Sequence, residues 1–316
     1  MMLENIRKPL AKHILATIAY YDAFDYPLSS FEIWKYLLRA DYAEEPSLAN
    51  TFSLAEVIAE LQGEALGLFL VFKNGMWALK GREDLVAKRT ARAKVSVSKL
   101  RRLRRVVFFL RFVPFVRMVA VTGRLAMKHA KVSSDWDVFI VLKRGALWRG
   151  RTILTAFLHF AGKRRYGNKV KDRVCLNYFA TTDGLEVPAK DLYSSSEYFF
   201  ILPLFGCKTF QSFQVRNRWI RKIRPHFAIV ENCGMLCWQD DIFSRALRGL
   251  GEKLFAASFW EKWLKSFEYG KIMRNPKTHC QGSFIHVSEN ALIFLPSPHG
   301  PRVFERFKEI SKKLAL

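Results

Sequence analysis

The chain has 316 residues, of which half are hydrophobic and 25% are charged, a composition that excludes a disordered protein and predicts two or three folded domains. Its 52 Lys and Arg residues outnumber its 28 Asp and Glu residues and give a net charge of +24. This charge favours polyanionic partners such as nucleic acid, nucleotides or anionic lipid.

Neither a membrane-spanning nor an exported protein is expected. The most apolar run, residues 106–121, is interrupted by Arg111, Pro114 and Arg117, and it is shorter than the roughly 20 residues of a spanning helix. The start of the chain has an early acidic residue and no small-residue cleavage site. We therefore expect a cytoplasmic protein without a membrane partner.

The five cysteines are odd in number and widely spread along the chain. This distribution favours reduced, mostly buried thiols over a disulfide framework. Cys233 and Cys237 have no matching Cys or His pair nearby, so the spacing does not predict a zinc site.

Residues 1–81 are predicted to form a helical unit that ends in a hairpin. Apolar residues recur at helical spacing in residues 10–21. Two further helices are predicted by capping boxes, formed by Ser29 with Glu32 and by Ser53 with Glu56. Asn74-Gly75 then predicts a tight turn between two short strands. Three helices followed by a hairpin are typical of a winged helix-turn-helix, whose third helix commonly enters the major groove of DNA.

The charge of this first unit does not favour DNA. Residues 1–80 carry 7 basic and 10 acidic residues, and the third helix, residues 53–65, has three Glu and no Lys or Arg. A structural role, or docking of a protein partner at the winged helix, is therefore at least as strongly indicated. Residues 81–316 carry 45 basic and 18 acidic residues, so we expect any polyanion contact there.

Residues 82–112 are predicted to form a basic linker helix. Ten basic residues and no acidic ones lie between Lys88 and Arg111. An apolar stripe includes Leu100, Leu103, Val107 and Leu110. The helix is either a solvated linker packed on the next domain or a track along a nucleic-acid backbone. The second interpretation is favoured, because no acidic residues interleave for i,i+4 pairing.

Residues 113–190 show alternating short apolar runs and loops. Strands are predicted at 115–121, 136–143 and 174–181, and a helix at 147–162, so we expect an α+β protein with a central mixed sheet. Asp135 and Asp137 are one residue apart, so their side chains point the same way on an extended backbone. Two such carboxylates repel each other unless a cation lies between them.

The chain resembles the motif of nucleotidyltransferases of the polymerase-beta superfamily. The resemblance lies in Gly123-Arg124, the ten residues that follow, and the alternation of Asp and apolar residues at 135–138. The resemblance covers roughly residues 113–185. Such a domain behind a winged helix is similar to bacterial nucleotidyltransferase-domain proteins. It implies transfer of a nucleoside monophosphate from a nucleoside triphosphate to an acceptor hydroxyl. RNA is favoured over DNA as the acceptor, with a small-molecule or protein hydroxyl left open.

The resemblance also implies roles for individual residues. Asp135 and Asp137 would be the catalytic carboxylates that hold Mg²⁺ (or Mn²⁺), and the backbone at Gly123 would approach the triphosphate. Arg124 and Ser133 would contact substrate phosphates. For Ser133, stabilisation of its own loop is the simpler interpretation.

Two departures from the family motif support a second hypothesis. Arg124 replaces a small residue and would either clamp a phosphate or fill the space of the triphosphate. Family members commonly carry a third carboxylate on a later strand, but the strand at 174–181 has none. Asn177 is the polar residue of this strand that could take its place, and Asp172 and Asp183 flank the strand. The alternative is a catalytically inactive nucleotidyltransferase-fold protein that binds nucleic acid or nucleotide.

Residues 191–316 are predicted to be mainly helical. Ser194 and Glu197 are spaced as a capping box that opens an apolar helix through residue 206, and residues 240–276 are predicted as a long helical segment. No chemistry is assigned to three histidines in a loop-rich tail, namely His279, His286 and His299.

Overall fold

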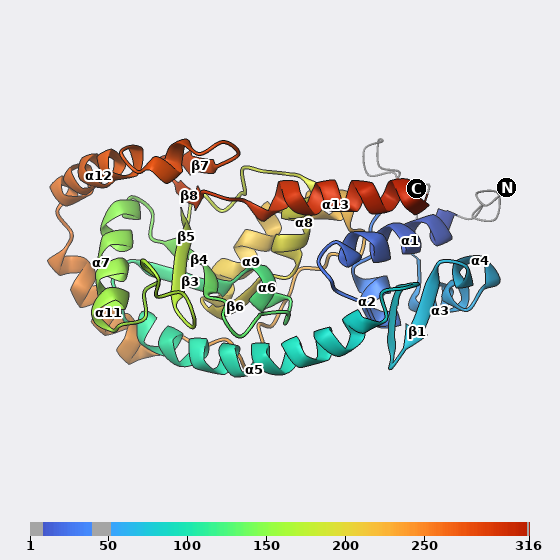
Figure 1. Cartoon of the computed structure of the whole chain (residues 1–316). Coiled ribbons are helices and arrows are strands. Elements are labelled where there is room, and N and C mark those ends of the chain that lie inside the picture. Colours follow the sequence, from blue (N-terminus) through green and yellow to red (C-terminus); the bar gives the residue numbers. More distant parts are fainter. Residues whose placement is uncertain (1–8, 40–51, 315) are drawn as a thin grey trace.

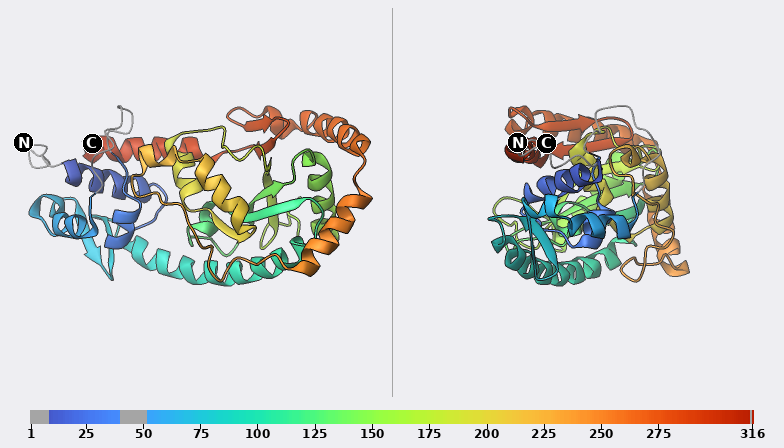
Figure 2. Two further views of the ribbon diagram at one scale, coloured as in Figure 1. Left: turned by 180° about the vertical axis from the view of Figure 1, so that it is seen from behind. Right: turned by 90° about the vertical axis from the view of Figure 1, so that its right-hand side faces the viewer.

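The computed structural model describes residues 9–39, 52–314 and 316; residues 1–8 and 40–51 of the predicted 1–81 unit lie outside this description. The protein is α+β, as predicted, and the described residues form a six-stranded mixed sheet and a two-stranded hairpin packed with helices. The molecule is elongated, with the N-terminal unit at one end and the sheet beyond it (Figure 1, Figure 2). Among the described helices, none combines the length and the apolar character that crossing a bilayer requires.

The N-terminal unit has the predicted order of helices and hairpin. Its elements are α1 (Pro9–Asp22), α2 (Ser30–Lys35), α3 (Leu54–Leu61), α4 (Glu64–Gly67), β1 (Leu70–Lys73) and β2 (Met76–Leu79). Both predicted capping boxes form, at Ser29 with Glu32 and at Ser53 with Glu56. Asn74 and Gly75 have φ angles of 48° and 80° at the turn between β1 and β2, in the left-handed region that a tight hairpin requires.

The core of this unit continues into the rest of the chain. Val303 and Phe307 of α13 (His299–Leu314) and Leu192 belong to the same buried cluster as the apolar residues of α1. Figure 1 shows α13 returning along the molecule to lie beside α1. Tyr26 Oη also donates a hydrogen bond of 2.8 Å to the carbonyl of Met127. The unit is therefore packed against the central and C-terminal regions.

The basic linker is the long helix α5 (Asp84–Leu110), which runs from the N-terminal unit beneath the sheet (Figure 1). The predicted apolar stripe is buried, at Leu100, Leu103, Val107 and Leu110. Two of the basic residues are buried as well. Arg89 forms an ion pair with Glu32, and Lys99 Nζ lies 2.8 Å from Asp172 Oδ1. These two cations hold α5 against its neighbours, and the remaining basic face is more exposed.

The central sheet contains every predicted strand of residues 113–190 and three more. Its strands are β3 (Val116–Val121), β4 (Trp136–Leu142), β5 (Val174–Thr181), β6 (Leu202–Phe205), β7 (Phe284–Val287) and β8 (Ala291–Leu295), in the order β6-β3-β4-β5-β8-β7. β4 and β5 are parallel and are joined across α7 (Leu147–Phe160), while the other pairs are antiparallel. The parallel pair places the starts of β4 and β5 at one end of the sheet.

Helices cover both faces of the sheet. Alternate side chains of β4, such as Val138 and Ile140, lie in one core with apolar residues of α5 and α7. Phe139 and Val141 point to the other face and pack with residues of α8 (Leu192–Phe199), α9 (Cys207–Arg216) and α10 (Ile220–Ile223). The strand alternation therefore decides which face each β4 side chain serves.

The region after residue 190 corrects two predictions. Ser194 does not open a helix with Glu197, because α8 begins at Leu192 and the Asp191 side chain caps it by accepting a 2.7 Å hydrogen bond from Ser194 N. The helix predicted to continue through residue 206 ends early, and Pro203 lies in the edge strand β6. Proline cannot continue a helix but is tolerated at a sheet edge.

The end of the chain is more regular than predicted. Residues 240–276 form α11 (Ile242–Leu254) and α12 (Ser258–Met273), followed by a 3₁₀ turn (Pro276–His279). The tail that was predicted to be rich in loops instead contributes β7, β8 and α13. Within this tail, β8 pairs with the edge of β5, and α13 buries Val303 and Phe307 against α1.

A disulfide between Cys207 and Cys233 corrects the prediction of reduced thiols for this pair. The two Cα atoms are 5.8 Å apart although 26 positions separate them in the sequence, so the spacing of the cysteines could not reveal their proximity. Of the remaining cysteines, Cys237 is buried, Cys175 is half-buried and Cys280 is exposed.

Candidate functional site

The two predicted metal ligands lie at the start of β4. Asp135 immediately precedes the strand and Asp137 is its second residue. Ligand atoms of Asp135, Asp137 and Cys175 all lie within 4.8 Å of one another, so the two carboxylates do point the same way. Cys175 joins them because the β4–β5 register places it opposite Asp137.

A glycine turn leads from β3 to the same place. Gly123 opens the short helix α6 (Gly123–Ala126), and its φ of +61° is one that glycine adopts readily. The amide of Thr122 donates a 3.1 Å hydrogen bond to the carbonyl of Asp137. A Cβ atom at Gly123 would lie 3.2 Å from Asp137 Oδ2. The turn therefore packs against Asp137 so closely that a side chain at position 123 would crowd its carboxylate.

Asp137 is only weakly neutralised by its surroundings. Loss of solvent contact and the neighbouring Asp135 raise the pKa of Asp137 to about 7, although Arg165, Cys175 and Asn177 act in the opposite direction. Asn177 Nδ2 donates a 3.3 Å hydrogen bond to Asp137 Oδ1. An amide offers less stabilisation to a carboxylate than a full positive charge does, so the site favours a further cation.

Arg165 forms an ion pair with Asp135. Its Nη1 lies 2.6 Å from Asp135 Oδ2 and 3.4 Å from Cys175 Sγ. The guanidinium thus stands where a cation bound to Asp135 would be expected. The Arg165 side chain is 45% exposed, so it can leave this position without opening the core.

The two flanking aspartates are engaged elsewhere. Asp172 accepts hydrogen bonds from Lys99 Nζ at 2.8 Å and from Arg102 Nη1 at 2.6 Å. Asp183 follows the far end of β5 and forms an ion pair of 3.0 Å with Arg144. Neither belongs to the cluster of Asp135 and its partners.

A different acid, Glu197 of α8, lies within electrostatic range of the pair. Burial, Asp137 and Asp191 together raise the pKa of Glu197 to about 7. No ion pair to Glu197 is found within residues 9–39 and 52–314. A third acid, contributed by α8 and not by β5, therefore interacts electrostatically with Asp137.

The two predicted phosphate contacts differ in their surroundings. The Arg124 side chain is half-buried, has no ion pair in the described part of the chain, and interacts electrostatically with His299 and Tyr193. The charge of Asp135 also acts on the pKa of His299, and no ion pair of Arg124 with Asp135 or Asp137 is found in the described part of the chain. Ser133 is exposed, and it is Ser134 that closes the loop, by donating a 2.9 Å hydrogen bond to the carbonyl of Lys131.

The donor atoms fit a hard divalent cation. Mg²⁺ and Mn²⁺ bind through one or two carboxylates together with substrate phosphates, which Asp135 and Asp137 can supply. Burial and then Asp137 raise the pKa of the Cys175 thiol to about 12, so a thiolate is not offered. This combination favours Mg²⁺ or Mn²⁺ over Zn²⁺.

Sequence reasoning missed Arg165, Cys175 and Glu197. Cys175 could have been found, because it lies two residues before Asn177 and therefore on the same side of a strand. Arg165 and Glu197 come from a loop and a helix whose positions depend on the whole fold.

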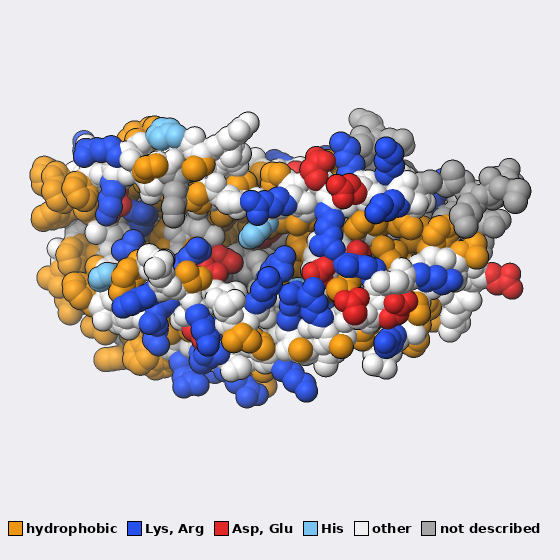
Figure 3. Space-filling model, in the orientation of Figure 1, with side chains coloured by type: hydrophobic (Ala, Val, Ile, Leu, Met, Phe, Trp, Pro, Cys, Tyr) orange, Lys and Arg blue, Asp and Glu red, His pale blue; other side chains and the backbone are white. Residues whose placement is uncertain are grey.

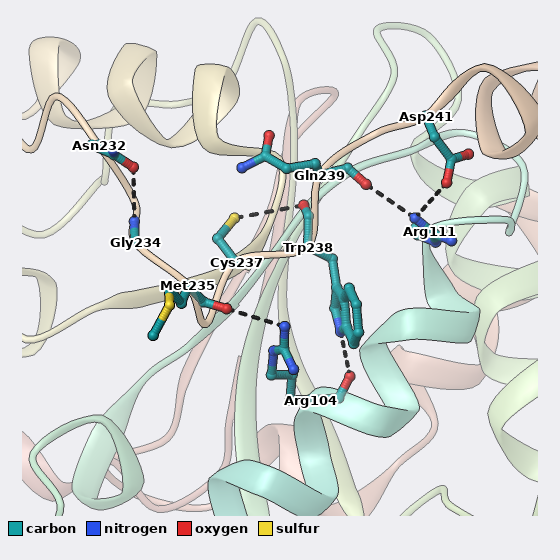
Figure 4. Close-up of a pocket in the computed structure, with 9 residues that line it drawn as sticks. All are labelled: Arg104, Arg111, Asn232, Gly234, Met235, Cys237, Trp238, Gln239 and Asp241. Atoms are coloured by element: carbon teal, nitrogen blue, oxygen red, sulfur yellow. Dashed lines mark hydrogen bonds and ion pairs between the residues drawn. The ribbon is translucent and has the colours of Figure 1, made fainter.

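A groove of about 620 Å³ elsewhere on the molecule is a packing contact (Figure 4). It is lined by α5 and by the segment after residue 231. Arg104 Nη2 donates to the carbonyl of Met235 at 3.1 Å, and Trp238 Nε1 donates to the carbonyl of Arg104 at 2.8 Å. Arg111 forms a 3.0 Å ion pair with Asp241. The charged groups of this groove are thus used to hold the segment on α5.

The face shown in Figure 3 is rich in Lys and Arg along α5 and across its centre, with a few acidic side chains among them. Comparison of the chain with protein-family models, with curated proteins and with solved structures found no match. The functional argument therefore rests on the geometry and charge of the site.

Proposed function

We propose that the protein is a metal-dependent nucleotidyltransferase that transfers a nucleoside monophosphate from a nucleoside triphosphate to an acceptor hydroxyl and releases pyrophosphate. RNA is the favoured acceptor. The observation that carries the proposal is the contact of the Gly123 turn with Asp137, beside the converging carboxylate of Asp135. A backbone turn for phosphates next to two carboxylates for a cation is the arrangement that nucleotidyl transfer requires.

Each residue has a defined part in this proposal. Asp135 and Asp137 hold Mg²⁺ or Mn²⁺, which when bound neutralises charge that develops on the triphosphate. Gly123 keeps the turn free of a side chain, so that backbone amides approach the phosphates. Arg165 leaves Asp135 and, with Arg124, balances the phosphate charge.

Glu197 is assigned to the acceptor hydroxyl. A carboxyl group with a pKa of about 7 can accept a proton near neutral pH, which is the range in which a general base works best. Its electrostatic interaction with Asp137 supports this assignment, and the strand residues Cys175 and Asn177 lack a carboxylate.

The second candidate is a nucleotidyltransferase-fold protein that binds nucleotide or nucleic acid without catalysis. The observation that favours it is the 2.6 Å pairing of Arg165 with Asp135, because a permanent guanidinium there would exclude the cation. Calorimetry with Mg²⁺ and Mn²⁺ separates the two candidates. Cation uptake that is lost in Asp135→Asn supports the enzyme, and nucleotide binding without cation uptake supports the second candidate.

The direct test incubates the purified protein with each α-labelled nucleoside triphosphate, Mg²⁺ or Mn²⁺, and total cellular RNA. We expect label transfer to RNA, and a loss of about 1,000-fold or more in Asp135→Asn and Asp137→Asn, since each removes a metal ligand. Asp183→Asn is the matched control, because its partner Arg144 lies at the other end of β5. Label transfer that persists in both site variants would refute the assignment.

A further inference from the structure

A second groove, of about 550 Å³, opens between α5, α7 and the segment 161–173. Four of its lining side chains are basic: Arg102 and Arg105 from α5, and Lys163 and Arg173 from the segment. Asp172 is the one acid among the described lining residues, and its carboxylate is already bound by Lys99 and Arg102. The groove is therefore strongly positive, and Figure 3 shows Lys and Arg side chains concentrated between α7 and α5.

Two aromatic rings lie in the same groove without a covering element. Phe109 of α5 is 56% exposed and Phe157 of α7 is 38% exposed. Exposed phenyl rings among cations are the combination that single-stranded nucleic acid uses, because bases stack on the rings while phosphates contact the cations. A purely electrostatic contact would not require the rings.

Trp136 adds an independent observation. It lines the groove and is almost fully buried, yet its Nε1 has no hydrogen-bond partner among the described residues. The indole N–H is a donor only, so a buried one without an acceptor is unfavourable. The unpaired donor therefore lies in the wall of the groove, next to the space that we assign to a ligand.

The groove lies close to the candidate catalytic pair. Trp136 is the residue between Asp135 and Asp137 and points to the opposite face of the sheet. Arg173 precedes Cys175 by two residues at the start of the neighbouring strand. A chain bound in the groove thus reaches the end of the sheet where Asp135 lies.

We propose that this groove binds single-stranded nucleic acid, by stacking of bases on Phe109 and Phe157 and by contacts of phosphates with Arg105, Lys163 and Arg173. If the proposed function holds, the bound strand is the RNA that accepts the nucleoside monophosphate; this part of the inference rests on the proposed function. Duplexes are excluded from this mode of binding, because their bases are already stacked on one another.

The test measures binding of a fluorescein-labelled 12-residue oligouridylate by anisotropy, in EDTA and without nucleoside triphosphate. We expect Phe109→Ala with Phe157→Ala to weaken binding by about 10-fold or more. Arg105→Ala with Arg173→Ala should weaken it similarly and reduce the slope of the salt dependence by about 0.7 for each phosphate that the variant no longer neutralises.

Matched controls come from other exposed surfaces. Phe259→Ala with Phe267→Ala removes two exposed rings from α12, and Arg218→Ala with Lys308→Ala removes two exposed cations. Neither should change binding by more than about 2-fold, apart from the general effect of net charge. Thermal unfolding of each variant checks that the truncated surface side chains leave the fold intact.

Three results would overturn the proposal. Unchanged affinity in the variant that lacks both Phe109 and Phe157 would show that bases do not stack on these rings. Equal affinity for a duplex or for heparin would show that the groove is a general polyanion surface. Binding of poly-glutamate as tight as that of the oligonucleotide, with the same dependence on Phe109 and Phe157, would indicate an acidic protein partner. Because the assay contains neither metal nor triphosphate, it stands or falls separately from label transfer by Asp135 and Asp137.

Discussion

Neighbouring cations neutralise Asp25 of the N-terminal unit more completely than they neutralise the acids at the start of β4. Asp25 lies 2.8 Å from Arg82, 2.8 Å from Lys88 and 2.9 Å from Arg306. Partial burial alone would raise the pKa of Asp25, but the hydrogen bonds from Lys88 and Arg306 hold this pKa well below its usual range. The carboxylate is fully neutralised by the chain itself.

At the sheet the neutralisation is incomplete. Asp135 has one ion pair, to Arg165, and Asp137 is contacted by the amide of Asn177. The pKa values of Asp137 and Glu197 are both about 7, raised first by burial. The chain surrounds Asp25 with three cations but gives Asp135 and Asp137 fewer, and this contrast is what our proposal of a bound cation predicts.

After the two metal-ligand variants described above, the largest effect is expected from Gly123→Ala. Its methyl group would lie 3.2 Å from Asp137 Oδ2, on a backbone with φ of +61°. We expect label transfer to fall by about 100-fold, because a displaced carboxylate no longer positions the reactants. Gly75→Ala is the control, since Gly75 has φ of +80° and nothing within 4 Å of an added Cβ. Equal activity of the two variants would mean that the Gly123 turn is not part of the site.

Glu197→Gln tests whether the acid of α8 belongs to the site. Activity should fall by about 10-fold to 100-fold, as is typical for loss of a general base. The thermal midpoint should not fall, because no ion pair to Glu197 is present in the described structure. Glu186→Gln serves as the control, since Glu186 is exposed and pairs with Lys190. A decrease in stability without a decrease in activity would make Glu197 a structural residue.

Glu197 also illustrates how far sequence reasoning reaches. Local signals were reliable: both N-terminal capping boxes, the turn at Asn74 and the alternation of Asp135 and Asp137 depend on neighbours in the chain. After residue 190, Asp191 with Ser194 has the same three-residue spacing as Ser194 with Glu197, and only the fold selects between them. Because Asp191 caps α8, the Glu197 carboxylate is not used as a cap, and it interacts electrostatically with Asp137.

Other features could not be predicted from neighbouring residues, because they depend on contacts between distant segments. β6, the Cys207–Cys233 disulfide and the pairing of Arg165 with Asp135 all join segments whose proximity arises from the assembled sheet. Propensity favoured a helix through residue 206, and the edge of β3 overrode it. Residues that are close only in the final fold therefore supplied most of the corrections.

Asp25→Asn should lower the stability of the protein, whereas Asp137→Asn should not. The first removes the partner of three cations and should lower the free energy of unfolding by about 2 kcal/mol, or the thermal midpoint by about 4–8 °C. In EDTA, Asp137→Asn should leave the midpoint unchanged or raise it, because a poorly neutralised carboxylate is replaced by a neutral amide. Calorimetry checks both. A similar decrease in both variants would contradict the distinction between the two sets of acids.

The smallest effect is expected at the junction of the two regions, where His129 contacts Tyr26 edge-on at 5.1 Å and accepts a hydrogen bond from Arg92. Burial, Arg92 and Arg124 lower the pKa of His129 to about 3. The unfolded chain, with a His pKa of about 6.5, therefore binds the proton first. The stability that His129 contributes is complete above pH 6.5 and decreases as the pH falls towards 3.

His129→Gln keeps an acceptor for Arg92 but cannot gain a proton. Between pH 7 and pH 4.5, its thermal midpoint should fall by roughly 3 °C less than that of the unmodified protein. The lower limit stays above the ordinary pKa of aspartate, about 3.9, so the Asp25 ion pairs remain formed throughout. Asp137 titrates in this window with the opposite sign, but it does so in both proteins and cancels in their difference. Parallel curves would show that His129 is not held neutral in the folded state.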